Sequence, residues 1–369
     1  MDSYRTERIH SIDYIRFYAI FAVILTHTMP FHDTFYALST GKLNLIFEGT
    51  FDFIVNLSIR FAIPFFFIIA GYLYGRKAAQ GSNTGTKLMS SLLRLMSIWF
   101  AWFVLYIFIP NIDDLISAYK DPTNWFTGYV DRSLILNRLF DGDPIHLLGG
   151  TYGHLWFIPV LAFALLIATP FYRANLLGVF LILAGTLLGV VLTAGTYGFT
   201  PAGMFANKLI DSYSLPLGSV SVLVFAIFYV AIGMWLSLKN ITFSIGYSLG
   251  LAGAGFALSV AEAVILRFFT DGNPLIVSNY LGTTLLAIGV ATYTISNPHV
   301  GKNSFLTKYG KYTLGVYVIH ACILQYLMLM SYFVVVPGWQ IIFPILVYVF
   351  SLALAWVLSK NKWTEWAVV

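Results

Sequence analysis

Long apolar stretches separated by short polar segments run the length of the chain. Ten of these stretches are long enough to cross, as helices, the roughly 30 Å of hydrocarbon in a bilayer. The pattern therefore predicts an all-α fold, a polytopic membrane helical bundle with about ten transmembrane helices. The predicted spans lie near residues 12–30, 52–74, 89–110, 154–172, 175–194, 219–238, 243–266, 278–297, 311–334 and 340–359.

Composition agrees with this interpretation. The chain has 369 residues, of which 59% are hydrophobic and 10% are charged, whereas a soluble domain carries roughly 25% charged residues. The polar amino-terminal segment leads directly into a full-length span and lacks the features of a cleaved signal peptide. We therefore expect residues 1–369 to form a single integral-membrane domain, a multi-pass protein of the cell (inner or plasma) membrane.

The distribution of lysine and arginine predicts the orientation. With the amino terminus inside, the cytoplasmic segments hold thirteen of the 21 Lys and Arg residues, and the outer segments hold six. Cytoplasmic loops of membrane proteins carry this excess, so both termini are expected in the cytoplasm. The same topology explains the net charge of +5, and no nucleic-acid partner is predicted.

One connection, about residues 111–153, is much longer than the others and lies on the predicted outer side. Long loops on a fixed scaffold commonly carry binding function. This loop is rich in aspartate, and an acidic cover over the bundle is the plain alternative.

Two ionisable side chains, Arg16 and His27, interrupt the first apolar span. Such groups are costly in hydrocarbon, so they usually face a bundle interior and mark a working site. Their spacing corresponds on a helix to about 16 Å of rise and to roughly three full turns. Both side chains are therefore expected on one inward face, with Arg16 near the cytoplasm and His27 near the outer surface.

Each of these residues also has a structural interpretation. Asp13 precedes Arg16 at the spacing of a helical ion pair, so the two can lie at the interface with Arg16 reaching toward water. His27 taken alone is most simply a hydrogen-bonded histidine at the membrane edge. Their place on one face favours a shared site.

The pattern resembles that of a known family. Asp13-x-x-Arg16, followed after ten residues by His27, is similar to the first-helix signature of the membrane acyltransferase 3 family, inner-membrane proteins that acylate the sugars of surface glycans. Further segments resemble family motifs in the expected order: Pro64–Leu73, the basic residues from Arg76 to Arg94, His154–Phe157 and Tyr312–His320. The resemblance covers about residues 9 to 359 and implies a membrane-bound, acyl-CoA-dependent O-acyltransferase.

Residue chemistry and the resemblance together suggest roles. Histidine suits a general base because its pKa lies near neutrality, and arginine, which stays protonated, suits a phosphate or the pantetheine arm. The catalytic set is His27, Arg16 and Asp13; the donor-binding set is Arg16, Arg76, Lys77, Lys87, Arg94, His320 and Tyr317; the acceptor-binding set is His154, Trp156 and Tyr152. The expected partners are acetyl-CoA or another acyl-CoA, a glycan or glycolipid acceptor, and the lipid bilayer.

Simpler explanations stand beside these roles. Positive-inside topology also explains the basic cluster, and aromatic belts place residues such as Trp156 and Tyr152 at interfaces in any case. His320 can equally be a buried, hydrogen-bonded histidine. Two further buried charges, Arg60 and Glu262, are expected to pair with each other.

No metal site is predicted, because the seven histidines form no close ligand pair. The chain has no Gly-x-Ser-x-Gly sequence, and its single cysteine, Cys322, has no basic neighbour in sequence. Direct transfer without a covalent acyl-enzyme is therefore the simpler hypothesis.

Two other classes of function share the buried charges. The first is a transporter or flippase for a lipid-linked glycan or acyl group, although no internal repeat supports it. The second is a sensor or scaffold that keeps the site without turnover. Among enzymes, transfer of succinyl or a longer acyl chain and N-acylation of an amino sugar stay open, as does the identity of the acceptor.

Overall fold

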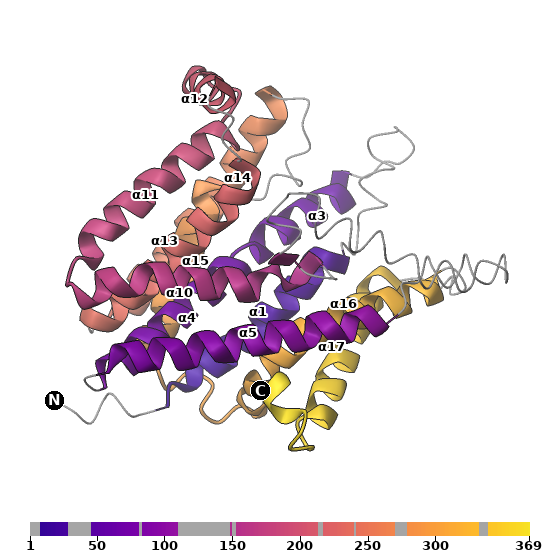
Figure 1. The fold of residues 1–369 in the computed structure, drawn as a ribbon. Helices are drawn as coiled ribbons and strands as arrows, with labels where there is room; N and C mark the ends of the chain where they lie inside the picture. The colour runs from indigo at the N-terminus through magenta and orange to yellow at the C-terminus, as the bar shows by residue number, and fades with distance from the viewer. Residues whose placement is uncertain are drawn as a thin grey trace. The chain divides into compact units, whose positions relative to one another are not determined.

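The computed structural model describes residues 8–28, 46–80, 83–109, 148–149, 153–212, 217–239, 241–269, 279–331 and 339–369. Every regular element in these ranges is a helix, as the sequence predicts (Figure 1). The long connection of about 111–153 falls almost entirely outside the described residues, and so does Tyr152.

The described helices follow one another through both halves of the chain. They are α1 (His10–Thr28), α3 (Ile46–Ile59), α4 (Ala62–Ala79), α5 (Thr84–Phe108), η3 (Gly153–Trp156), α10 (Phe157–Arg173), α11 (Leu177–Ala194), α12 (Pro201–Ser212), α13 (Leu217–Lys239), α14 (Ile245–Phe269), α15 (Leu281–Ser296), η4 (Phe305–Lys308), η5 (Gly310–Tyr312), α16 (Thr313–Ser331), α17 (Trp339–Leu358) and η6 (Glu365–Ala367).

Seven helical segments in the described part of the chain are long and apolar enough to cross a membrane. They are Phe53–Ala79, Thr84–Phe108, Gly153–Arg173, Leu177–Ala194, Ser221–Leu238, Ile245–Phe268 and Ile341–Leu358. The other three predicted spans contain α1, α15 and α16. Of these, α15 has only 16 residues, about 24 Å of rise, and charged side chains interrupt α1. The chain is thus a multi-pass membrane protein, while ten crossings and cytoplasmic termini stay predictions.

The second predicted span is not one continuous helix. Helix α3 ends at Ile59 and α4 begins at Ala62, so the helix is interrupted at Arg60. The Nε of Arg60 donates to Oδ1 of Asn56 at 2.8 Å, and its guanidinium lies 5.1 Å from the centroid of the Tyr280 ring. Asn56 and Tyr280 thus surround the break with protein groups, as irregular backbone at membrane depth requires.

Internal packing divides the chain into two compact units. Unit 1 comprises Met1–Leu88 and Phe163–Gly310, and unit 2 comprises Met89–Ala162 and Lys311–Val369. Each unit is built from two segments that are distant in the sequence. A single functional domain over residues 1–369 stays a prediction.

Helix α4 is the centre of unit 1, where it packs against α13, α1 and α15. A Cβ atom at Gly71 would lie under 3.0 Å from the backbone of Val230, and one at Gly233 would lie under 3.0 Å from the backbone of Ile68. Only glycine fits at such distances, so α4 and α13 are in direct backbone contact. Small residues commonly serve this purpose where helices associate in a membrane.

Unit 2 is built around helices α16 and α17, which lie side by side (Figure 1). The short helix η3 packs against α16. Helix α5 joins them through its aromatic side chains. Nε1 of Trp102 donates to the carbonyl oxygen of Ala367 at 3.0 Å, and the hydroxyl of Tyr106 donates to that of Val318. These bonds fix α5 against both α16 and the carboxy-terminal segment.

Candidate active site

Helix α1 carries the three residues predicted to be catalytic, and it is packed inside unit 1. It contacts α3, α4, α15 and η4, and Oγ of Ser11 donates to the carbonyl oxygen of Thr294 at 2.6 Å. The helix is unbroken from His10 to Thr28. Arg16 and His27 therefore lie on one rigid element, about 16 Å apart along its axis.

Arg16 and His27 lie on the packed face of α1. At about 100° per residue, both side chains project between the directions of Val23 and Ile20, which are buried. Tyr18 is exposed and projects roughly from the opposite side. Arg16 is half-buried with a buried Nε, and His27 is exposed at the end of the helix. The face that carries both groups is thus packed inside unit 1 at Ile20 and Val23 and becomes exposed where it ends at His27.

Asp13 is engaged near the start of α1. Its Oδ2 accepts from Nη2 of Arg8 at 2.6 Å and from Nε of Arg8 at 3.0 Å. The Arg8 side chain is 59% exposed, and an ion pair in such a place contributes at most about 1 kcal/mol. The partner that the structure shows for Asp13 is therefore Arg8, and a catalytic role for Asp13 stays a prediction.

The basic residues predicted to bind the donor fall in both units. Arg76 and Lys77 form the last turn of α4 and Lys87 lies in the first turn of α5, all three in unit 1. Arg76 lies over the Tyr72 ring, 5.9 Å from its centroid. Arg94 belongs to unit 2, where its Nη2 donates to the backbone oxygen of Val369. A joint phosphate site for all four stays a prediction.

The structure brings together three site residues of unit 2 that the sequence analysis assigned to different substrates. The ring centroids of His154 and His320 are 5.1 Å apart, with the ring planes at 80°. The hydroxyl of Tyr317 donates to the carbonyl oxygen of His154, and its ring lies 5.7 Å from the His154 ring. The two histidine rings are therefore in contact, although their motifs are far apart in the sequence.

Backbone carbonyls determine the neutral tautomer of each ring. Nδ1 of His320 lies 2.6 Å from the carbonyl oxygen of Tyr317, and Nε2 of His154 lies 3.4 Å from that of Val318. A carbonyl can only accept, so these two nitrogens carry the hydrogen in the neutral rings. The basic lone pairs are then on Nε2 of His320 and Nδ1 of His154. His320 is fully buried, which fits its structural interpretation, and donor binding by His320 or Tyr317 stays a prediction.

Tyr106 of α5 completes this cluster and was missed by sequence reasoning. Its ring meets the His154 ring edge-on at 5.7 Å, and its hydroxyl bonds the backbone of Val318. A single aromatic residue in an apolar helix carries no signal that could have found it.

Trp156, predicted to bind the acceptor, is half-buried in η3, with its ring 6.2 Å from that of Phe157.

Glu262 of α14, expected to pair with Arg60, caps helix α15. Its carboxylate accepts from the backbone N–H of Leu281 at 3.1 Å and of Gly282 at 2.9 Å, and from the hydroxyl of Tyr197. Burial and the Glu262 carboxylate raise the pKa of Tyr197, so the phenol stays a hydrogen-bond donor at neutral pH. An anion is favoured at a helix amino terminus by the backbone dipoles. Glu262 thus has a clear structural role.

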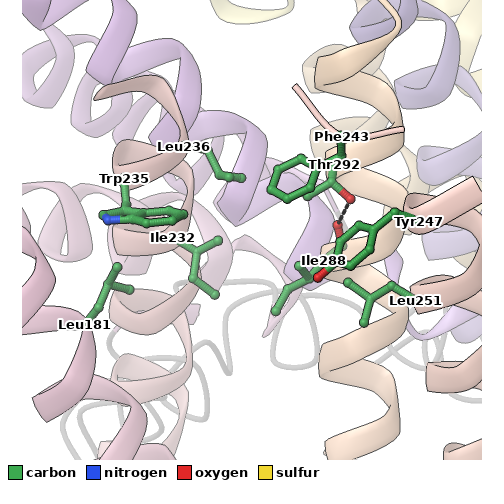
Figure 2. Close-up of a pocket in the computed structure, with 9 residues that line it drawn as sticks. All are labelled: Leu181, Ile232, Trp235, Leu236, Phe243, Tyr247, Leu251, Ile288 and Thr292. Carbon is green, nitrogen blue, oxygen red and sulfur yellow. Dashed lines mark hydrogen bonds between the residues drawn. The ribbon is translucent and has the colours of Figure 1, made fainter. Parts of the chain in front are cut away.

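Unit 1 also contains an apolar cavity of about 250 Å³. Figure 2 shows Trp235 facing Phe243 and Tyr247 across it. The lining residues are Leu181, Ile232, Trp235, Leu236, Phe243, Tyr247, Leu251, Ile288 and Thr292. None of them is charged or a histidine, and the Thr292 hydroxyl donates to its own helix at Ile288. Acid–base chemistry therefore has no place in this cavity.

Comparison with known proteins decides the family. The model of the acyltransferase 3 family, described as an acyltransferase domain, matches residues 9–360. The chain belongs to this family. The resemblance of the sequence motifs is thereby confirmed, and residues 9–360 form an acyltransferase domain.

A more distant similarity links the chain to an amino-acid racemase of Enterococcus faecalis. The two are 27% identical over 208 residues, which is 55% of this chain and 25% of the racemase. The chain thus spans about a quarter of the length of that relative. No solved structure matches the chain.

Proposed function

We propose that this acyltransferase moves an acyl group, acetyl in the simplest case, from cytoplasmic acyl-CoA to a sugar hydroxyl of a cell-surface or lipid-linked glycan. The observation that carries the proposal is the placement of Arg16 and His27 on one packed face of α1, about 16 Å apart. Two substrates arriving from opposite sides of a membrane need such a separation between the group that binds the donor and the base that activates the acceptor.

In the proposed reaction His27 takes the proton of the acceptor hydroxyl as that oxygen attacks the thioester carbonyl carbon. A carbon–oxygen bond forms, the carbon–sulfur bond to CoA breaks, and the imidazolium returns its proton to the leaving thiolate. The histidine therefore ends the cycle neutral. A positioned general base of this kind accelerates a reaction by about 10²–10⁴.

Arg16 supplies a different element of the mechanism. It remains protonated at neutral pH and presents a planar fork of N–H donors. In the proposal it holds a phosphate or amide oxygen of the donor arm, so that the thioester stands near His27. Lysine has the charge but not the fork, and Arg16→Lys should retain only part of the activity.

The experiment compares purified wild-type protein with His27→Gln, His27→Ala, Arg16→Ala and Arg16→Lys, in detergent, with labelled acetyl-CoA and a sugar acceptor. We expect the two His27 variants and Arg16→Ala to lose transfer by about 10² or more. His10→Ala removes another histidine from the same helix and serves as the matched control. The protein level and elution profile of each variant establish that it has folded.

Two outcomes would contradict the proposal. Normal transfer by His27→Gln and Arg16→Ala would remove both residues from the mechanism. Wild-type protein that binds acyl-CoA but transfers nothing without a membrane gradient would favour the transporter or flippase. Acceptors that carry an amino group, and donors with longer chains, extend the same assay to N-acylation and to acyl length.

A further inference from the structure

Helices α16 and α17 of unit 2 meet closely at one end. A Cβ atom at Gly315 would lie 2.8 Å from the Cβ of Ala355 and 2.9 Å from that of Val368. The first turn of α16 therefore packs directly on the last turns of α17 and on the segment that follows. As a result, Lys311, just before α16, and Lys360, just after α17, come to the same end of the helix pair.

Both lysines are exposed, and each is seated on an aromatic ring. Nζ of Lys311 lies 4.8 Å from the centroid of the Tyr312 ring, and Nζ of Lys360 lies 5.0 Å from that of Trp356. Tyr312 is buried, and the charges of Lys311 and Lys360 both act on its phenol. Aromatic faces attract cations, so Lys311 is held on the buried Tyr312 ring and Lys360 on the exposed Trp356 ring.

A third cation reaches the same end of the helix pair from α5. Arg94 is exposed, and its Nη2 donates to the backbone oxygen of Val369, the neighbour of the Val368 that packs on Gly315. Two more charges of opposite sign, Lys362 and Glu365, lie on this carboxy-terminal segment and are exposed.

Topology alone explains why lysines are frequent on the predicted cytoplasmic side. It does not explain why two of them are held on aromatic rings at the joined ends of α16 and α17. Like charges held close together repel one another, and a bound anion removes that repulsion. Ammonium and guanidinium groups are the donors that phosphate oxygens accept from most strongly.

We propose that Lys311 and Lys360, with Arg94 beside them, form a subsite for the phosphate groups at the nucleotide end of the acyl donor. This inference rests on the proposed function, since it concerns the acyl-CoA of that reaction. In unit 2 the sequence analysis assigned the donor phosphates to Arg94 alone. The proposed subsite adds two lysines at the joined ends of α16 and α17.

The test measures KM with acetyl-CoA and with acetyl-pantetheine, which lacks the nucleotide phosphates. A charge-assisted hydrogen bond is lost with each lysine, so Lys311→Gln and Lys360→Gln should each raise KM for acetyl-CoA by about tenfold. Turnover at saturation and KM for acetyl-pantetheine should stay unchanged. Lys311→Arg and Lys360→Arg keep the cation and should stay near wild type, and Lys362→Gln is the matched control on the same segment.

An unchanged KM for acetyl-CoA in the double glutamine variant would overturn the subsite. So would an equal rise in KM for both donors, which would indicate a structural role. A second experiment measures binding to vesicles of phosphatidylglycerol or phosphatidylcholine by flotation. Lysine-dependent binding of phosphatidylglycerol together with an unchanged KM would assign the cations to a lipid headgroup and refute the donor subsite.

Direct binding of CoA and of pantetheine to the purified protein separates this inference from the proposed function. Wild-type protein that binds CoA in a lysine-dependent manner but transfers no acyl group would leave the subsite standing and remove the proposed reaction. Active protein whose CoA affinity is unchanged when both lysines are replaced would refute the subsite and leave the proposed reaction standing.

Discussion

Alanine at Gly255 should destabilise the protein, whereas alanine at Gly253, two residues away on the same helix, should not. A Cβ atom at Gly255 would come under 3.0 Å from backbone atoms of Gly282, Leu285 and Leu286 on α15. At Gly253 no atom lies within 4 Å of the added Cβ. The two glycines therefore stand on opposite faces of α14, one at the α15 interface and one away from it.

The magnitude follows from two opposing effects. Replacing glycine by alanine favours a helix by about 1 kcal/mol, and this gain is common to both variants. Overpacking costs roughly 1–3 kcal/mol, and the upper end applies at Gly255 because backbone atoms cannot turn aside as a flexible side chain does. The difference between the two variants is then about 3 kcal/mol, and it reports the helix contact alone.

Thermal unfolding of the purified variants in one detergent gives the comparison. We expect Gly255→Ala to melt below wild type and Gly253→Ala to melt at or slightly above it. Equal melting temperatures for the two variants would show that α14 and α15 are not in backbone contact, and the packing of unit 1 described above would be wrong.

Two further predictions concern polar contacts. Tyr317→Phe should lower stability by about 1 kcal/mol, because the carbonyl oxygen of His154 loses a buried donor; an unchanged melting temperature would argue against the contact. Glu262→Gln should cost about 1–2 kcal/mol, because a neutral amide replaces the carboxylate that accepts from Leu281 and Gly282. A melting temperature at the wild-type value would show that the charge does not cap α15.

Long apolar runs made the helices predictable. Each of the ten predicted spans contains a described helix, because hydropathy over about 20 residues is a local property that needs no knowledge of neighbours. The break at Arg60 was not predicted, since apolar residues on both sides hide an interruption that depends on Asn56 and Tyr280.

The family motifs were visible, but their geometry was not. Gly71 and Gly315 occur within recognised segments, yet only the structure shows that each touches the backbone or side chains of a partner far along the chain. The contact of His154 with His320 likewise joins two motifs that sequence spacing cannot bring together. Pairing of Arg60 with Glu262 was a natural expectation for two buried charges, and the structure instead places both beside Tyr280.

Small residues were the signal that could have been used more fully. On α4, Gly71 and Gly75 stand one turn apart, and on α13 Gly233 and Ser237 do the same. This spacing is typical of closely packed membrane helices and would have predicted the central pair of unit 1 from the sequence.

The most direct test of the account is transfer of labelled acetyl from acetyl-CoA to a sugar hydroxyl by purified protein in detergent. The account predicts label on the acceptor with wild-type protein and with His10→Ala, and none above background with His27→Gln. Equal labelling by wild-type and His27→Gln protein would show that the imidazole on the packed face of α1 does not activate the acceptor.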